Sequence, residues 1–146
     1  MSRLGQLHDC GVQLAFTARL PLVVLIAMGV KRWENRIHLP TPQKGTCAIS
    51  CSSNSTKKEY ENFLRWADEI IVPSVSRLIP QWNDVSVWRG HIVAVCDYNA
   101  GCTPGPAIWD EGYPIWWKIS NVRLLDSPIA CRGGLGMWDI NKGVTE

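Results

Sequence analysis

Glycine and proline divide this chain into short segments, and their placement constrains the fold more than any other feature of the sequence. The 146 residues include 12 Gly and 9 Pro, and the stretch 99–114 is especially rich in both. Because proline ends helices and glycine favours turns, few segments are long enough for the helices of a bundle. Eight Trp supply large apolar anchors. The pattern favours one domain of short strands, turns and a few helices.

Composition and charge exclude several classes of protein. Hydrophobic residues make up 46% and charged residues 19% of the chain, which excludes intrinsic disorder. A net charge of +2 argues against a protein that coats duplex DNA. Arg19 and Pro21 interrupt the apolar stretch 14–30, which is therefore too short to cross a membrane. Since no cleavable secretory signal is evident, we expect a cytoplasmic protein.

The cysteines are expected to be reduced thiols, as is usual in the cytoplasm. No pair has the CxxC spacing of a zinc site, and the histidines show neither metal-ligand nor catalytic-triad spacing. In an extended segment Cys47, Ile49 and Cys51 point to the same side, which is typical of core packing. We therefore expect neither a metal nor a cofactor. The six cysteines are Cys10, Cys47, Cys51, Cys96, Cys102 and Cys131.

Local patterns predict an alternation of strands and helices. Thr56 and Glu59 resemble a capping box ahead of apolar residues at helical spacing, which predicts a helix over 57–70. Pro21 suits the first turn of a helix that Gly29 ends. The β-branched segment 91–98 is expected to be a central strand. Further helices are expected at 21–28 and 74–79, further strands at 12–17, 32–37, 46–52, 115–125 and 136–140, and a turn at 126–128.

These elements predict an α+β fold: a small mixed β-barrel of about five or six strands with two or three helices packed outside. The segment 99–114 is expected to be a long loop, and such loops are often functional. We expect a flexible arm at 1–11, the domain at 12–140 and a C-terminal tail at 141–146.

Lys31, Glu34 and Arg36 bring three charges close together at the end of the helix predicted over 21–28. Glu34 and Arg36 share one face of the following strand, and Lys31 lies at its mouth. Such a cluster can line a polar cleft. The alternative is a solvated surface, in which each exposed pair is worth only about 0–1 kcal/mol. From the residues alone the solvated surface is the more frequent case.

The same cluster belongs to the first of three segments that resemble the ASCH family of the PUA-like superfamily. Arg19-Leu20-Pro21 and an apolar helix precede Gly29, Lys31, Glu34 and Arg36. This order is similar to the family's Pro–helix–GxKxxExR signature.

Two later segments resemble the family in the expected order. Arg89-Gly90 leads into the apolar strand 91–96 and Asp97, similar to the family's RG–strand–D segment. The third segment is similar to the closing P-x-x-x-x-G-x-L-G-x-W stretch. Together the three span most of 12–140, which makes the resemblance fairly specific. The matching residues of the third segment are Pro128, Gly133, Leu135, Gly136 and Trp138.

The resemblance implies a small PUA-like β-barrel with a cleft beside the first helix. It further implies that the chain binds RNA or a modified nucleoside, with Gly29, Lys31, Glu34 and Arg36 at the site. An alternative is a small amidohydrolase, since some ASCH members remove acyl groups from cytidine. A further alternative is a protein-interaction domain that has kept the fold and lost the pocket.

For hydrolysis the match is incomplete. In the hydrolytic members a lysine at the position of Lys31 acts with a threonine three residues later, where this chain has Glu34. A lysine beside a carboxylate is a poor nucleophile, although Glu34 itself can activate a water. If the chain is an enzyme, Lys31 and Glu34 are its candidate catalytic residues. We expect binding without turnover.

The cluster suits recognition of a nucleobase. Glu34 can accept a hydrogen bond from an exocyclic amine, as carboxylates do with cytosine. Lys31 can meet a carbonyl oxygen or a phosphate, and Arg36 can hold Glu34 in place. Trp33 can stack on a base, although its alternation with apolar neighbours favours core packing. Asp110-Glu111 in the long loop is either an acidic lid or a solvated tip.

Five further positions are weaker candidates for ligand contacts. Ser50 and Ser52 lie opposite the cysteine face and can reach the cleft, but they are also ordinary strand serines. Asp97 is a second acceptor or the start of a turn. At most one of the adjacent Trp116 and Trp117 is expected to face outward, and we name Trp117 for stacking. Arg132, before two glycines, contacts a phosphate or belongs to a plain turn.

Overall fold

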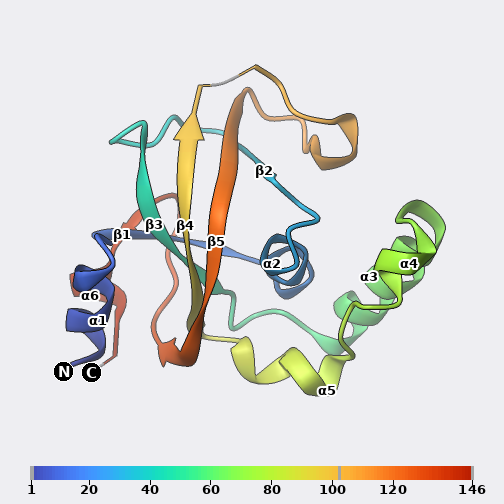
Figure 1. Cartoon of the computed structure of the whole chain (residues 1–146), viewed down its shortest axis with the longest axis horizontal. Helices are drawn as coiled ribbons and strands as arrows, with labels where there is room; N and C mark the ends of the chain where they lie inside the picture. The colour runs from blue at the N-terminus through green and yellow to red at the C-terminus, as the bar shows by residue number, and fades with distance from the viewer. Residues whose placement is uncertain (1, 102, 146) are drawn as a thin grey trace.

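A computed structural model describes residues 2–101 and 103–145, and one six-stranded sheet organises it (Figure 1). The strands are β1 (Leu14–Ala18), β2 (Trp33–Arg36), β3 (Lys44–Cys51), β4 (His91–Ala100), β5 (Ile115–Ala130) and β6 (Trp138–Asp139). Their order is β2-β5-β4-β3-β1-β6. β1 and β3 are parallel and the other neighbours are antiparallel. The mixed sheet curls strongly into a half-barrel, so that β1 runs across β3, β4 and β5 in Figure 1.

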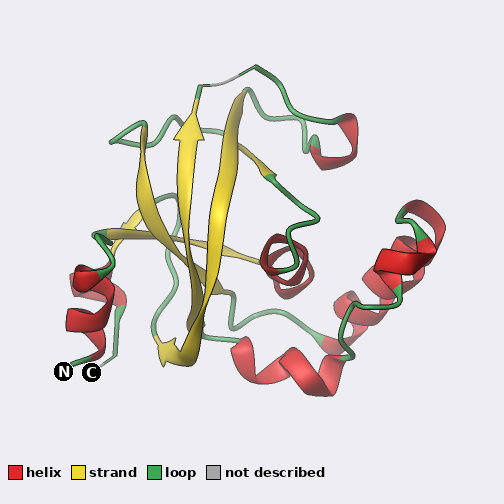
Figure 2. Cartoon of the chain, in the orientation of Figure 1, coloured by secondary structure: helices red, strands yellow, loops and turns green. Residues whose placement is uncertain are grey.

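Helices cover both faces of this sheet and extend beyond its edge (Figure 2). The described residues form α1 (Arg3–Asp9), α2 (Leu20–Ala27), α3 (Lys57–Ile70), α4 (Pro73–Ser76), α5 (Trp82–Val85) and α6 (Ile140–Gly143). Two short 3-10 helices are η1 (Ser86–Trp88) and η2 (Ala107–Trp109). The predicted α+β class is confirmed, with a curled half-barrel as its sheet. None of the helices in 2–101 and 103–145 has the length and apolarity needed to cross a bilayer.

The strongest local patterns produce the expected elements. Thr56 Oγ1 accepts a hydrogen bond from Glu59 N at 3.2 Å, and α3 begins at the next residue, Lys57, as predicted. Pro21 lies in the first turn of α2, and Gly29 follows the helix with φ of 76°. This left-handed conformation favours glycine and turns the chain toward β2. β4 lies between β3 and β5, as expected for a central strand.

The two faces of the sheet carry separate cores. Cys47 and Ile49 pack with α2 on one face, whereas Ala48 packs on the other with Leu7 of α1 and Ile140 of α6. The predicted burial of the cysteine face of β3 is confirmed. The opposite face is buried as well, because α1 and α6 cover it.

Three expectations about the chain's ends and turns are wrong. Instead of a flexible arm, the first residues form α1, capped by the Ser2 side chain, and the Leu7 side chain is fully buried. Instead of a free tail, the end of the chain continues through α6, and Val144 pairs with Cys131. No turn ends β5 at 126–128, and the strand runs on to Ala130. Its pairing with β4 shifts register there, because Leu124 pairs with Ala94 and Ile129 with Ile92, so the expected turn is replaced by an irregularity within the strand.

The described cysteines are free thiols. Cys47 and Cys96 face each other across β3 and β4, with their Sγ atoms 3.7 Å apart. Cys102 lies outside the described residues. Within those residues no group of three or more His, Cys, Asp or Glu is arranged to hold a metal ion.

Candidate functional site

A cleft of about 470 Å³ opens where β1, β2 and the start of α2 meet two loops. Glu34 and Arg36 of β2 lie on one side, and Thr17 of β1 and Arg19 lie opposite. The segments 111–113 and 133–135 close the remaining sides. The charge cluster of β2 therefore faces a cavity instead of open solvent.

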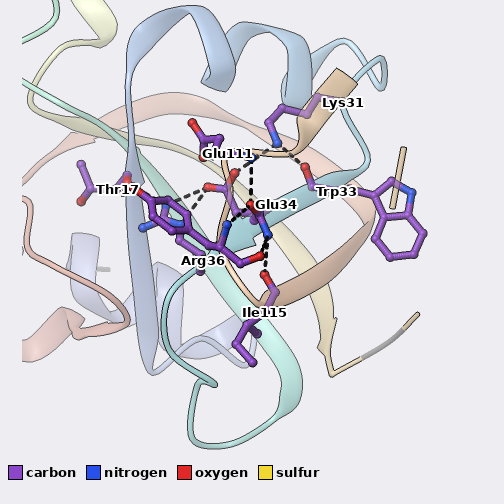
Figure 3. Close-up of polar contacts among 9 residues, drawn as sticks. Thr17, Lys31, Trp33, Glu34, Arg36, Glu111 and Ile115 are labelled. Carbon is purple, nitrogen blue, oxygen red and sulfur yellow. Dashed lines mark hydrogen bonds and ion pairs between the residues drawn. The ribbon is translucent and has the colours of Figure 1, made fainter. Parts of the chain in front are cut away.

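The Glu34 carboxylate lines this cleft and lies between Arg36 and Lys31 (Figure 3), and its side chain is only 2% exposed. Arg36 donates to Glu34 Oε2 through Nε at 3.0 Å and through Nη2 at 2.7 Å. Lys31 Nζ forms an ion pair with the other oxygen, Oε1, at 3.1 Å. Among the described residues none gives Oε1 a geometrically sound hydrogen bond. Oε1 therefore has the Lys31 ammonium as an ion-pair partner but no regular hydrogen bond.

Strand pairing explains this arrangement. Glu34 pairs with Trp117 in the β2–β5 ladder, and alternation along β2 places Arg36 on the same face as Glu34. Arg36 is held further by its bond to the Thr17 carbonyl at 3.0 Å and by the ring of Phe16, 5.3 Å from its Cζ. These contacts use Arg36 Nε and Nη2 and leave Nη1 for other partners.

Lys31 lies behind Glu34 and not in the cleft itself. Its side chain is 3% exposed, and Nζ donates to the Trp33 carbonyl and lies 5.2 Å from the ring centre of Trp109. The residue lines two neighbouring cavities but not the one that contains Glu34. The expectation that Lys31 and Glu34 line one cleft is therefore wrong. Lys31 is linked to the cleft through its ion pair with Glu34.

Asn35 fixes the loop that closes the cleft, a role that sequence reasoning missed. Its side chain is fully buried and donates to the carbonyls of Tyr113 and Ile115 at 2.8 and 3.0 Å. The Asn35 Oδ1 atom accepts from the backbone N–H groups of Glu111 and Tyr113 at 2.9 and 3.0 Å. An amide has both donors and acceptors, so one side chain can satisfy this loop. A polar residue between two charged ones gives no local signal of such a role.

Glu111 enters the cleft from this loop and faces Glu34 (Figure 3). Burial raises the pKa of the Glu111 carboxyl above its ordinary value, and the negative charge of Glu34 raises it further. Lys31 and Arg36 act on that pKa in the opposite direction. Glu111 lines the cleft and Asp110 does not, and both residues are exposed, so the two alternatives for Asp110-Glu111 stay predictions.

The segment that contains Gly133 and Gly134 packs directly on β1. Thr17 Oγ1 accepts from Trp138 Nε1 at 2.9 Å and from Gly134 N at 3.3 Å. A Cβ atom at Gly133 would lie 2.9 Å from Thr17 Oγ1, so only glycine allows this close approach. The motif thereby brings 133–135 to the rim of the cleft.

The other candidate residues divide into those that reach the cleft and those that do not. Ser52 lines it, whereas Ser50 is fully buried and shares a 2.7 Å hydrogen bond with Thr17. Gly29 lines a neighbouring cavity at the end of α2. Arg132 is exposed and donates to the Lys142 carbonyl at 3.2 Å, away from the cleft.

Asp97 lies within β4, and its carboxylate accepts from Thr46 Oγ1 at 2.9 Å and from Asn121 Nδ2 at 3.2 Å. It neither starts a turn nor lines the cleft, and both expectations for it are wrong. The longer run of β4 carries the chain past this position.

The tryptophans of the site are packing residues. Trp33 is half-buried against the edge of Trp116, with ring centres 6.3 Å apart, and lies outside the cleft. Trp116 and Trp117 are 6% and 1% exposed, so neither faces outward, and the expectation that Trp117 stacks on a ligand is wrong. Trp117 packs on Phe16, and Trp33 and Gly105 cover Trp116 from the other side of β5. The aromatic ring that does line the cleft is Tyr113, which is 41% exposed.

A search of protein-family models finds no match for this chain, and a search of curated protein sequences finds none either. Fold and site together define an α+β half-barrel domain with a cleft around one buried, charge-paired carboxylate.

Proposed function

We propose that the cleft binds a single nucleobase, as a free modified nucleoside or as one exposed base of RNA, through the Glu34 carboxylate. The observation that carries the proposal is the buried Glu34 side chain, which lines a cavity of ligand size and whose Oε1 atom has the Lys31 ammonium at 3.1 Å but no regular hydrogen bond among the described residues. A ligand N–H group that enters this cavity can donate to the Glu34 carboxylate.

The chemistry around Glu34 fits the edge of an amino-substituted base. Glu34 offers a charged acceptor to an exocyclic amine, as carboxylates do with cytosine N4. Arg36 Nη1 lies on the same guanidinium that holds Glu34, and it can donate to a ring nitrogen or carbonyl of the same base. The exposed ring of Tyr113 offers a surface on which a base can stack.

The charges at the rim favour a single base over a long strand. Arg19 is paired with Glu59 at 3.0 Å and also donates to the Asn54 carbonyl, so its charge is already compensated. Arg36 is committed to Glu34. Nucleic-acid strands are held mainly by unpaired Lys and Arg along the phosphates, and this rim does not provide such a row within its described lining.

The resemblance to the ASCH family supports the same proposal. The matched residues Glu34 and Arg36 of the first segment and Gly133 and Leu135 of the third line one cleft. The second segment forms the central strand β4 and does not directly position the matched residues of the first or the third segment. Residues far apart in the sequence thus line the cleft that we propose as the ligand site, whereas Gly29 and Lys31 of the first segment line a neighbouring cavity.

Isothermal titration with a panel of nucleosides, including N4- and N6-substituted ones, tests the proposal. Glu34→Gln keeps the shape of the side chain but removes its charge, and we expect it to weaken binding about 10- to 100-fold. Lys31→Ala should weaken binding too, and the two losses should not add because Lys31 acts through Glu34. Glu69→Gln, an exposed glutamate of α3, is the matched control. Binding that survives both substitutions unchanged would contradict the proposal and favour a protein-interaction domain.

One observation favours hydrolysis of an N-acylated base as a second candidate. Glu111 faces Glu34 across the cleft, and its raised pKa suits a group that accepts a proton from water and passes it on. Water would add to the amide carbonyl, the C–N bond would break, and the base amine would leave with the proton as the carboxylic acid forms. Lys31 is engaged as an ammonium with Glu34 and is not the nucleophile.

A deacylation assay on N4-acylcytidine separates the two candidates. If the chain is a hydrolase, Glu111→Gln should abolish turnover and leave ligand affinity largely intact. We expect binding without measurable turnover, because Glu34 occupies the position of the threonine that the hydrolytic relatives use.

A further inference from the structure

A second cavity, of about 410 Å³, lies between α3 and η2, on the side of α2 away from β1. In Figure 1 the segment carrying η2, drawn in orange at the upper right, faces the region of α3. We call this cavity the aromatic groove and define it by Phe63 and Trp66 of α3 and Trp109 of η2.

Apolar side chains, three of them aromatic, make up most of its wall, which also includes Lys31, Glu59, Asn62 and Glu111. The ring centres of Phe63 and Trp66 are 5.8 Å apart, and those of Trp66 and Trp109 are 6.3 Å apart, both with tilted planes. Leu22 and Ile108 add aliphatic surface, and Ile108 is 43% exposed. Half-buried rings beside an open cavity retain faces on which a planar apolar group can pack.

The aromatic groove lies next to the Glu34 cleft. Leu22 and Glu111 line both cavities. Lys31 lines the groove and pairs with Glu34 Oε1 at 3.1 Å, so the groove begins next to this carboxylate. A substituent on an amine that binds Glu34 from the cleft therefore lies beside the groove.

We propose that the aromatic groove receives a planar apolar substituent attached to the exocyclic amine of the base bound by Glu34. This inference rests on the proposed function and adds the class of modification. A cationic substituent would meet the ammonium of Lys31, which lies 5.2 Å from the Trp109 ring, and of the two glutamates that line the groove Glu59 is already paired with Arg19. A second cation there would be repelled by the first.

Matched pairs of nucleosides measure the contribution of the groove by isothermal titration. N4-benzylcytidine is compared with N4-methylcytidine, and N6-benzyladenosine with N6-methyladenosine, so that each pair keeps one amine N–H for Glu34. N4-(4-aminobutyl)cytidine tests the cationic alternative. We expect the benzyl member of the pair that binds to have an affinity about tenfold or more above its methyl partner.

Variants of Trp66 test whether the preference for the benzyl compound over the methyl compound arises in the groove. Trp66→Ala should bring the benzyl-to-methyl ratio close to one and leave the methyl compound's affinity unchanged. Trp66→Leu keeps apolar packing on α3 and should lower the ratio as well, which guards against a general folding defect. Trp82→Ala, another half-buried tryptophan outside the groove, should keep the wild-type ratio. The inference would be overturned by a benzyl-to-methyl ratio near one in the wild type or by a ratio that neither Trp66 variant changes. A preference for the aminobutyl compound would overturn it as well.

The same titrations distinguish failure of this inference from failure of the proposed function. Glu34→Gln should weaken both members of a pair equally and keep their ratio. If Glu34→Gln changes the affinity of neither compound while Trp66→Ala still brings the benzyl-to-methyl ratio close to one, the base-binding role of Glu34 is wrong. The inference about the groove then stands. If no nucleoside binds, the proposed function fails, and benzyl alcohol then tests the groove alone. Binding of benzyl alcohol that Trp66→Ala abolishes would support the groove, and its absence would overturn it.

Discussion

At the scale of single residues, the buried Glu34 carboxylate depends on two cations. Arg36 and Lys31 each contact a different oxygen of Glu34, and the side chains of Glu34 and Lys31 are 2% and 3% exposed. Taking such charges out of water costs several kcal/mol, which the pairing offsets. Losing one partner leaves an uncompensated buried charge. The site is therefore coupled to stability as well as to binding.

We predict that Lys31→Met destabilises the protein by about 3–5 kcal/mol, because Glu34 keeps its charge and loses one partner. Adding Glu34→Gln should recover part of that loss, since the uncompensated charge is removed. Urea unfolding of the two variants and of the wild type measures both effects. Lys57→Met is the control: Lys57 lies 3.8 Å from Glu61 on the surface of α3 and should cost at most about 0.5 kcal/mol. Equal losses in Lys31→Met and Lys57→Met would contradict the buried pairing.

The cysteines give a second prediction at this scale. Burial raises the pKa of Cys51 to about 12 and that of Cys131 to about 11, and hydrogen bonding to Cys96 and burial raise the pKa of Cys47. Since the thiolate is the reactive form, only exposed Cys10 should be alkylated quickly at pH 8 in a Cys102→Ser protein.

Mass spectrometry after iodoacetamide treatment checks this expectation. Native protein should gain one label, and protein in denaturant should gain five, one for each described cysteine. Fewer labels in denaturant without reductant would reveal a disulfide, and stoichiometric zinc by metal analysis would also contradict free thiols.

At the scale of elements, α1 is part of the domain and not an appended arm. The Leu7 side chain is fully buried in the core that α1 and α6 complete, and Val12 N donates to the Leu7 carbonyl at 3.0 Å. Seven residues are too few for a helix to be stable alone in water. Contact with the sheet supplies the missing stability.

Leu7→Ala should therefore destabilise the protein by about 2–5 kcal/mol, the range for truncation of a buried leucine. Chemical denaturation followed by tryptophan fluorescence measures the change. Leu78→Ala, at a position 72% exposed, should alter stability by no more than about 0.5 kcal/mol. If the two variants unfold at the same denaturant concentration, α1 does not contribute to the core.

At the scale of the whole molecule, the cleft joins segments that are distant in sequence. Glu111 reaches Glu34 because β2 pairs with β5 and because Asn35 holds the preceding loop. Its raised pKa is thus a property of the folded chain, caused first by burial and then by Glu34. The unfolded chain lacks both causes.

This difference makes stability depend on pH in a definite direction. The folded state binds the Glu111 proton more tightly than the unfolded state does, so ionisation of Glu111 opposes folding. Its contribution is favourable below the ordinary pKa of 4.5 and is lost as the pH rises through the raised value. Glu111→Gln should therefore be more stable than the wild type at pH 7 and equal to it at pH 4. Thermal unfolding at both pH values measures this, and a stability difference independent of pH would contradict it.

The sequence by itself determined the elements whose signals are local. The capping box and apolar period define α3, the β-branched run defines β4, and Pro21 and Gly29 delimit α2. Alternation along β2 also placed Glu34 and Arg36 on one face. These features depend on neighbours within a few residues, and the chain carries that information directly.

Only the tertiary structure decided what these elements meet. The pairing of β2 with β5 decides whether Glu34 is buried and whether Lys31 lies behind it. The same pairing decides whether Glu111 and Asn35 lie beside it. The same long-range contacts turn the first residues into α1 and extend β5 through its expected turn. Burial and ion pairing are properties of surfaces brought together across the chain, and no local pattern specifies which surfaces those are.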